Sequence, residues 1–409
     1  MVEGSTSDGP AVAVPVTSVP STVATLRSLG PLGIHTVVVS EKSTAQAFAS
    51  KYCDEVVATA DPHADLLAYR DDLLDVAARD DVRTIVPVRE VDAYVLSRYR
   101  SSFDPHVSLP VPDMAALERV HDRLLLAEVA EAAGVPVPET RRPDDVEDWS
   151  RDLLAKSRYN LLTSTYDDSL APGESATSDL IEHLEAGVVP DLVSLRERHR
   201  VEPIVQEFVP ADDEFMVAAL YDSGEPLVVF QHRQVRGTRY TGSGGAYRES
   251  VSIPELGRVA TDLLDHLEWH GLACLEYLRH ETTGEFVLAE INPRMWQSLA
   301  STVAMGADFP RYYWQQATGR ADEVDPSYDV GVGCHWVKGE LLHALSLFRF
   351  DSPHVERPGY AETLRDIAVS TYRHPRFDYL SLDDPGPFLQ DCSTLFAELP
   401  AVPRLQFGG

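Results

Sequence analysis

Residues 271–301 read GLACLEYLRHETTGEFVLAEINPRMWQSLAS and hold two β-rich runs on either side of a turn. The alternation along the second run predicts a strand packed on both sides, with even-numbered residues on one face and odd-numbered residues on the other. If Glu276 in the first run pairs with Glu290 in the second, the connection is residues 281–285, a common length for a hairpin loop. That register predicts that the two carboxylates lie on the same face of the sheet.

Two glutamates in this arrangement need a positive partner. Like charges opposite each other destabilise a sheet, because the roots of the side chains are only about 5 Å apart. Together with the amide oxygen of Asn292, Glu276 and Glu290 offer the hard oxygen ligands that suit Mg²⁺, with Mn²⁺ as an alternative ion and substrate phosphates in the remaining positions. Arg294 follows, and its planar fork fits the oxygens of a phosphate or an acyl phosphate. An acidic surface hairpin is the competing interpretation.

The order of these residues carries a family resemblance. Glu276, a hairpin and then AEINPRMWQS (residues 289–298) resemble the closing metal-binding strands of ATP-grasp enzymes. The resemblance implies ATP and Mg²⁺ as cofactors, with Glu276, Glu290 and Asn292 as metal ligands and Arg294 as a catalytic residue at the reacting phosphate. It also implies an α/β fold class, in which an α+β ATP-grasp domain follows a Rossmann-like parallel α/β domain.

The first part of the chain fits that order of domains. Strands predicted at residues 11–16, 36–39, 56–57 and 84–88 alternate with helices predicted at 22–29 and 66–78, the pattern of a parallel α/β sheet. A dinucleotide-binding site is excluded because the first turn, VTSVPSTVATLRSLG, has no G-x-G-x-x-G. The segment RSLGPLGIHTVVVSEKSTAQAFASKYCDEVV resembles the domain that precedes the ATP-grasp fold.

The chain therefore divides into three expected parts. We expect residues 1–110 to form the Rossmann-like domain and residues 111–320 to form the ATP-grasp domain, with two subdomains and a hinge near residues 203–209. Residues 321–409 form a C-terminal extension, in which we predict a strand and a helix within residues 328–350 and a proline-rich, loop-like remainder.

Two cations are candidates for the nucleotide phosphates. A helix is predicted from an N-cap at Asp113 to Gly134, and HDRLLLAEVAEAAGVPVPET resembles the linker helix and entry of ATP-grasp proteins, with Arg123 where the family usually has a phosphate-binding Lys. An ordinary surface arginine is the alternative. Lys156 ends a short apolar strand, where the family has a Lys that contacts the α-phosphate and the adenine edge. In a chain with so few lysines, one inside a β-rich segment favours a ligand contact.

The resemblance extends to the base and the ribose of ATP. Residues 203–209, PIVQEFV, resemble the hinge whose backbone reads the adenine edge, which implies roles for Gln206, Glu207, Phe208 and Val209. Glu214 matches the acid that holds the ribose hydroxyls, although an acidic loop end is the alternative. The glycine-rich flap that covers the phosphates in the family has no counterpart, since residues 157–179 contain only Gly173.

The segment FQHRQVRGTRYTGSGGAYRES is basic and rich in glycine for this chain. Its arginines could grip an anionic substrate through bidentate pairs, and its glycines allow close backbone approach. A surface loop is the simpler interpretation. The residues concerned are Arg233, Arg236, Arg239, Arg248, Gly242, Gly244 and Gly245.

Composition excludes several classes of function. The chain has 409 residues and a formal net charge of −30, which argues against nucleic acid and anionic membrane as partners and resembles the acidic surface of a protein from a high-salt cytoplasm. No apolar run is long enough for a membrane span, and the N-terminus lacks the pattern of a signal peptide, so we expect a cytoplasmic protein. The cysteines lack zinc-site or disulfide spacing and are expected to be small core residues.

Together these features predict an ATP-grasp ligase. The family implies phosphorylation of a small-molecule carboxylate by ATP and attack by an amine, which yields an amide, ADP and phosphate. We expect an amino acid or peptide as the carboxylate, and a homodimer is a further expectation. A nucleotide-binding protein without catalysis is the first alternative. A carboxylase or carbamoyl-phosphate type enzyme is the second, and its need for extra domains argues against it in a chain of this length.

Overall fold

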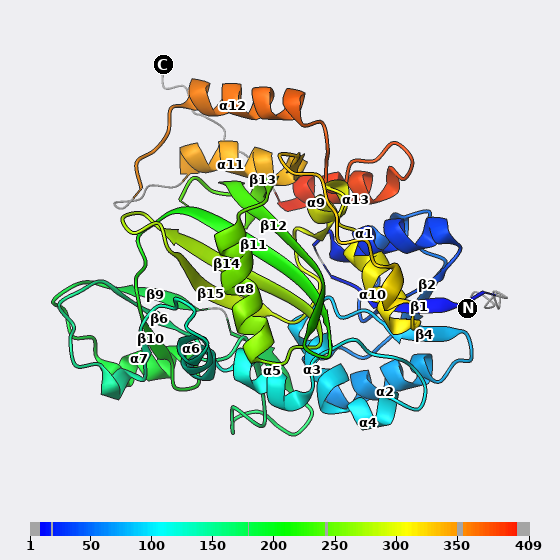
Figure 1. The fold of residues 1–409 in the computed structure, drawn as a ribbon, viewed down its shortest axis with the longest axis horizontal. Helices are drawn as coiled ribbons and strands as arrows, with labels where there is room; N and C mark the ends of the chain where they lie inside the picture. Colours follow the sequence, from blue (N-terminus) through cyan, green and yellow to red (C-terminus); the bar gives the residue numbers. More distant parts are fainter. Residues whose placement is uncertain (1–8, 18, 179, 242–243, 350–354, 399–409) are drawn as a thin grey trace, which may run out of the picture.

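The computed structural model describes residues 9–17, 19–178, 180–241, 244–349 and 355–398 (Figure 1). A large antiparallel sheet occupies the centre of Figure 1, with an N-terminal parallel sheet on one side and a small sheet on the other. No helix in these ranges combines the length and the apolar character needed to cross a membrane.

The N-terminal sheet is parallel throughout, in the order β3-β2-β1-β4. This confirms the predicted parallel α/β sheet. The central strand β1 reads AVAVP and is buried along its whole length, as expected for a parallel strand covered on both faces. Its elements are β1 (Ala11–Pro15), α1 (Ser21–Leu29), β2 (His35–Ser40), β3 (Glu55–Ala58), α2 (Leu66–Ala77), β4 (Val82–Ile85), α3 (Glu90–Arg98) and α4 (Arg100–Phe103), with short 3₁₀ turns at Gly30–Leu32 and Gln46–Ala49.

The predicted linker helix is two helices, α5 (Met114–His121) and α6 (Arg123–Ala132), so the single continuous helix was wrong. Asp122 separates them, because its backbone is extended and its side chain accepts a hydrogen bond from the Leu124 N–H as the N-cap of α6. The predicted N-cap at Asp113 is confirmed, since its side chain accepts from the Ala116 N–H.

The small sheet has the strand order β5-β10-β6-β9 and packs against helix α7. Lys156 is the last residue of β6, as predicted. A separate two-stranded hairpin, β7–β8, follows β6 in the chain. The elements are β5 (Thr140–Arg141), a 3₁₀ turn (Pro143–Asp145), β6 (Leu153–Lys156), β7 (Leu161–Thr163), β8 (Ser175–Thr177), β9 (Ile181–Leu184), α7 (Leu192–His199) and β10 (Ile204–Glu207).

The large sheet has the order β15-β14-β11-β12-β13-β16 and is antiparallel. Alternate residues of β11 enter two different cores: Phe215 and Val217 pack with α8, whereas Met216 and Ala218 pack with α1, α9 and α10. Its elements are β11 (Ala211–Asp222), β12 (Glu225–Gly237), β13 (Gly245–Val251), α8 (Pro254–His266), β14 (Gly271–His280), β15 (Phe286–Asn292), α9 (Leu299–Ala304), α10 (Phe309–Ala317), a 3₁₀ turn (Ala321–Glu323) and β16 (Gly333–His335).

The β14–β15 hairpin has the predicted loop and the predicted pairing of Glu276 with Glu290. The predicted strict alternation along β15 was wrong, because a bulge shifts the register so that Tyr277 pairs with Leu288. Leu288 therefore packs in the same core as Ile291. Glu290 stays on the face of Glu276, opposite to Leu288.

The C-terminal extension contains α11 (Val337–Arg349), α12 (Tyr360–Arg373) and α13 (Gly386–Glu398). The predicted strand and helix are confirmed by β16 and α11, whereas a loop-like remainder was wrong for residues 355–398. Prolines mark the helix ends there, with Pro358 before α12, Pro375 after it and Pro387 in the first turn of α13. Residues 399–409 lie outside the described part of the chain.

Strand β16 pairs with β13, so the extension joins the edge of the large sheet. The proposed domain limits at residues 110 and 320 stay predictions. As expected, Cys274 and Cys334 are buried core residues; Cys53 and Cys392 are partly exposed, and none of the four forms a disulfide.

Candidate functional site

Two adjoining cavities, of about 450 Å³ and 390 Å³, lie between the large and small sheets. Lys156 and Glu290 line both of them. The first cavity is lined by polar and apolar side chains of β11–β15 and of the segment that follows β15, among them Glu214, Met216, His232, Arg248, Glu276, Trp296 and Ser298. The second is lined by a more charged set, Glu90, Arg123, Lys156, Asn160, Glu290 and Arg294 with Thr177, Ser178, Leu180 and Ile181.

The two hairpin glutamates have different electrostatic environments. Desolvation, with the charge of Glu290 added, raises the pKa of Glu276 to about 7. Solvent still reaches this side chain, so the desolvation comes from the protein groups that surround it in the cleft. Burial also raises the pKa of Glu290, but the charges of Arg123 and Arg294 and a hydrogen bond from Asn160 outweigh it and hold this pKa below its usual value. Arginines thus balance one carboxylate of the pair, and Glu276 has no salt bridge among the described residues.

Asn292 and Arg294 extend this group toward the N-terminal sheet. Arg294 donates from Nη2 to Asn292 Oδ1 at 3.4 Å and from Nε to Glu90 Oε1 at 2.6 Å. Glu90 begins α3, just beyond the carboxyl end of β4. The sequence analysis missed Glu90, although ligand sites of open parallel sheets lie at the carboxyl ends of strands and that rule could have drawn attention to it.

Lys156 reaches the cleft from the small sheet. Its Nζ donates to Gln206 Oε1 at 2.7 Å, and Gln206 Nε2 donates to Thr140 Oγ1 at 3.0 Å. Burial, reinforced by the charge of Arg123, lowers the pKa of Lys156 to about 8. The ammonium is held by a neutral amide, so it can receive an anion without first breaking a salt bridge.

Arg123 and Asn160 both contact Glu290. Arg123 Nη2 lies 3.3 Å from Glu290 Oε2, and Asn160 Nδ2 donates to Glu290 Oε1 at 2.9 Å. Arg123 also donates to the carbonyl of Ser157 and to the amide oxygen of Asn160. No spacing in the sequence pointed to Asn160.

The predicted adenine hinge lies away from these charges. Neither cavity is lined by Glu207, Phe208 or Val209. The Glu207 carboxylate lies 3.5 Å from Arg151, and the Phe208 N–H donates to the Asp152 carbonyl at 3.3 Å. Their predicted contact is through the backbone and stays a prediction.

Glu214 lines the first cavity from strand β11. Gln234 donates a hydrogen bond to its carboxylate, and desolvation raises its pKa. The structure thus brings the proposed ribose acid, the proposed metal ligands and Lys156 to one cleft.

Acidic side chains pair with the predicted substrate arginines Arg233, Arg236 and Arg248. Arg248 is 2% exposed and lies 3.1 Å from Asp378, although it lines the first cavity. Arg236 holds Glu340 through two hydrogen bonds of 2.8 and 2.9 Å. Arg233 is 3.7 Å from Asp213, on β11.

The remaining residues of that segment lie near the cavity mouth. Arg239 follows β12 in the chain and does not line either cavity. Gly244 and Gly245 line the first cavity, and a Cβ at Gly245 would lie 2.6 Å from Arg248 Nε, so this position requires a glycine. Gly242 lies outside the described residues.

No protein-family model matches the chain, and no curated protein does. Solved structures do match. The biotin carboxylase domain of Hydrogenobacter thermophilus 2-oxoglutarate carboxylase, in complex with MgADP, ADP and bicarbonate, has a TM-score of 0.58 and 16% identity over 78% of this chain and 72% of that chain. The ADP complex of PurK, an N5-carboxyaminoimidazole ribonucleotide synthetase, has a TM-score of 0.56 and 17% identity over 80% of each chain.

Rhizobium etli pyruvate carboxylase matches 79% of this chain with a TM-score of 0.57 and 15% identity, and this chain spans 29% of its length. The chain has an ATP-grasp fold. The biotin carboxylase neighbour is one domain of a 2-oxoglutarate carboxylase, so the expectation that a carboxylase needs further domains stays a prediction.

The donor set in this ATP-grasp cleft fits Mg²⁺. Glu276, Glu290 and Asn292 offer hard oxygen atoms, and among the described residues only Glu290 of the carboxylate pair forms a salt bridge. In the described ranges no three His, Cys, Asp or Glu side chains converge as a metal cage. An ion here would therefore need oxygen atoms from a bound phosphate as well.

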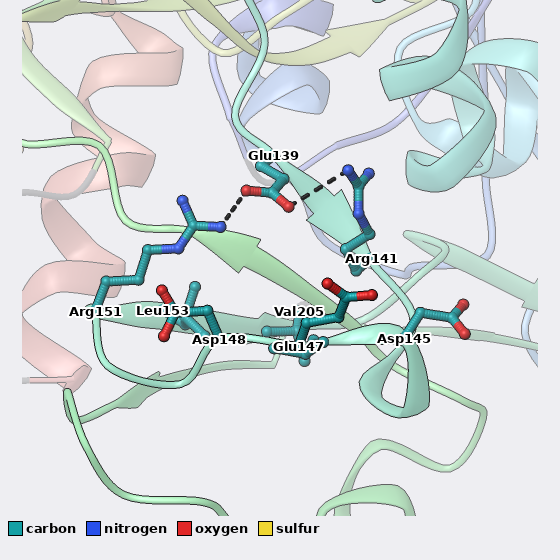
Figure 2. Close-up of a pocket in the computed structure, with 9 residues that line it drawn as sticks. Glu139, Arg141, Asp145, Glu147, Asp148, Arg151, Leu153 and Val205 are labelled. Carbon is teal, nitrogen blue, oxygen red and sulfur yellow. Dashed lines mark hydrogen bonds and ion pairs between the residues drawn. The ribbon is translucent and has the colours of Figure 1, made fainter.

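A further cavity, of about 440 Å³, lies on the small sheet of the ATP-grasp fold (Figure 2). Figure 2 shows Glu139 between Arg151 and Arg141, with which it forms ion pairs. None of the predicted site residues lines this cavity.

Proposed function

We propose that this protein is an ATP-dependent ligase that joins a carboxylate to an amine. The observation that carries the proposal is the Glu276–Glu290 pair, in which Glu276 has no salt bridge among the described residues. This pair lies in the same cleft as Lys156, Arg123 and Arg294. A complete set of acids and phosphate-binding cations has no structural purpose that would justify its electrostatic cost.

Glu276, Glu290 and Asn292 would hold Mg²⁺. Bound there, the ion would neutralise the phosphates of ATP and orient them for transfer. Asn160 orients Glu290 through its hydrogen bond, and Arg294 fixes the Asn292 side chain. In this proposal the residues that approach the metal are themselves held in position before the nucleotide arrives.

The remaining charges receive the nucleotide. Lys156 and Arg123 contact the phosphates, and Arg294 stabilises the charge that develops on the transferred phosphoryl group. Glu214 accepts hydrogen bonds from the ribose hydroxyls. The backbone of residues 206–209 recognises the adenine edge.

The chemistry has two steps. An oxygen of the substrate carboxylate attacks the γ-phosphorus, and the bond from that phosphorus to ADP breaks. The amine nitrogen then attacks the acyl carbon, the bond to phosphate breaks, and the nitrogen loses a proton. The acceptor carboxylate would lie at the arginine-rich segment 233–248, from which Gly244, Gly245 and Arg248 line the first cavity.

A carboxylation reaction is the second candidate. The observation in its favour is the likeness to a biotin carboxylase domain solved with MgADP and bicarbonate. In that case bicarbonate takes the place of the organic carboxylate, and its carboxyphosphate delivers a carboxyl group to the amine.

The test is the release of ADP and phosphate from MgATP, screened over a matrix of amino acids, small carboxylates and bicarbonate, with products identified by mass. The screen is run at high salt, which reduces the self-repulsion of a chain with a net charge of −30. The ligase proposal predicts that release of ADP and phosphate depends on one pair of carboxylate and amine. The product should have the summed mass of the carboxylic acid and the amine, less one water. Dependence on bicarbonate selects the second candidate. Release at the same rate without any acceptor, or no release, contradicts both.

A further inference from the structure

We propose that residues 157–178 form a fixed wall of the nucleotide cleft, fastened to the N-terminal sheet, and not a mobile flap. The inference deepens the proposed function, because the wall borders the site assigned to the phosphates. Thr177, Ser178 and Asn160 line the second cavity together with Arg123 and Arg294.

The β8 end of the wall is fastened through its backbone. The Ser175 N–H donates to the His63 carbonyl at 3.2 Å, and the Leu66 N–H donates to the Gly173 carbonyl at 2.5 Å. The Ser175 hydroxyl donates to the Pro62 carbonyl at 2.9 Å and lies 3.0 Å from His63 Nδ1. Opening the wall would break every one of these bonds.

The β7 end is fastened by packing. Leu161 is 1% exposed and belongs to the core that contains the N-terminal sheet and α3. His121 donates from Nε2 to the Leu161 carbonyl at 2.8 Å, and Thr163 Oγ1 lies 3.4 Å from the Tyr94 hydroxyl. A segment that moved with each nucleotide would expose this core and leave buried carbonyls without donors.

A group of aromatic rings adds to the packing at the β7 end. Tyr159 and Tyr166 stack with ring centres 4.4 Å apart, and both rings lie within 5.5 Å of the ring of His121, on α5. The wall thus contacts helix α5 through the residues around β7. Such contacts characterise the rigid parts of a fold, since loops that open have few buried apolar contacts.

The wall explains why this segment has so little glycine. Gly173 has a φ of +104° and uses its freedom for the turn that meets residues 65–67, where a Cβ would find its nearest atoms at 3.6 Å. A backbone held in this way does not need to wrap the phosphates. Side chains take that position, and Asn160 adds a hydrogen bond of 2.9 Å to Glu290, so the wall also supports the proposed metal ligand.

The first test is amide hydrogen exchange of the full-length protein, with and without MgADP. The wall predicts that the Leu66 and Ser175 amides exchange about as slowly as those of strand β1 without nucleotide, and change by less than about threefold when MgADP is added. Exchange as fast as in the hairpin loop 281–285 without nucleotide, followed by slowing of about tenfold or more with MgADP, would overturn the inference.

The second test is the His63→Cys/Ser175→Cys double variant, in which a disulfide would hold the wall to the N-terminal domain. ADP affinity and ATP turnover are measured with the disulfide formed and after its reduction. The two positions are adjacent main chain to main chain, as a disulfide requires. A fixed wall predicts that ADP affinity and ATP turnover agree within about twofold in the two states. A loss of tenfold or more on oxidation, restored by reductant and absent in each single variant, would show that the segment must move.

The two tests separate this inference from the proposed function. If the reduced variant and the native chain both fail to bind ADP, the nucleotide site is wrong. The exchange experiment without nucleotide still decides whether the segment is fixed.

Discussion

Lys156 shows how the fold changes the chemistry of a single residue. Burial and the nearby Arg123 lower its pKa to about 8, while its hydrogen-bond acceptor, Gln206, carries no charge. A bound phosphate would favour the charged ammonium and raise this pKa again. The free energy lost by burying the ammonium is thus recovered when an anion binds.

The lowered pKa of Lys156 gives a prediction for nucleotide binding near pH 8. Because the free Lys156 is about half deprotonated there, ADP binding should take up about half a proton. Lys156→Arg should abolish the uptake, since a guanidinium stays protonated at this pH. Calorimetric titrations in buffers of different ionisation enthalpy measure the proton uptake that accompanies ADP binding. Equal uptake by the native chain and the variant would contradict the pKa assignment.

The site residues differ in how far the sequence could predict them. Glu276 and Glu290 could be predicted from the sequence, because a hairpin fixes which residues face each other and the length of its loop can be read from the sequence. Asn160 and Glu90 could not be predicted. Asn160 lies 130 residues from Glu290 in the chain, and Glu90 lies 204 residues from Arg294. Contacts of that kind depend on how whole elements pack.

At the scale of elements, Asp122 decides where a helix begins. It caps α6 and also accepts two hydrogen bonds from the Arg158 guanidinium, whereas Asp113 caps α5 at an exposed position. The sequence pattern predicted a helix across Asp122 because an aspartate inside an apolar periodic run reads as helical surface. The bulge of β15 was missed for a similar reason, since nothing in the local alternation marks it.

We therefore expect Asp122→Ala to destabilise the protein by about 2 kcal/mol, from the lost cap and the lost ion pair. Asp113→Ala, the matched control, should cost about 1 kcal/mol or less because it removes a cap alone. Urea unfolding followed by circular dichroism gives both values. Equal losses would mean that Arg158 contributes nothing through Asp122.

At the scale of the whole molecule, the C-terminal extension is part of the large sheet. Asp378 reaches Arg248 of β13 and accepts a hydrogen bond of 2.7 Å from Ser301, so three distant segments meet in one buried group. The sequence predicted the N-terminal parallel sheet and the β14–β15 hairpin, and it predicted other strands without their pairing. It gave no indication that Arg236 and Arg248 would be paired with acids of the extension, because ion pairs between distant segments leave no periodicity.

Removing the charge of Asp378 should therefore be costly. Asp378→Asn leaves the buried Arg248 without its counter-charge, and we expect a loss of about 3–5 kcal/mol. Asp383→Asn is the matched control, since its pair with Lys51 is exposed and should contribute less than about 1 kcal/mol. Thermal melts at fixed salt compare the two variants. Similar melting temperatures would show that the extension is not held by this pair.

A magnesium–nucleotide site built on the Glu276–Glu290 pair can be tested by calorimetric titration with ADP, with and without Mg²⁺. We predict that Mg²⁺ tightens ADP binding to the native chain by about tenfold or more, equal to about 1.4 kcal/mol. Glu290→Gln should lose that gain and keep its binding of metal-free ADP. Glu285→Gln, in the exposed loop of the same hairpin, should behave like the native chain. ADP binding that does not depend on Mg²⁺ in the native chain, or a full gain in Glu290→Gln, would contradict the account.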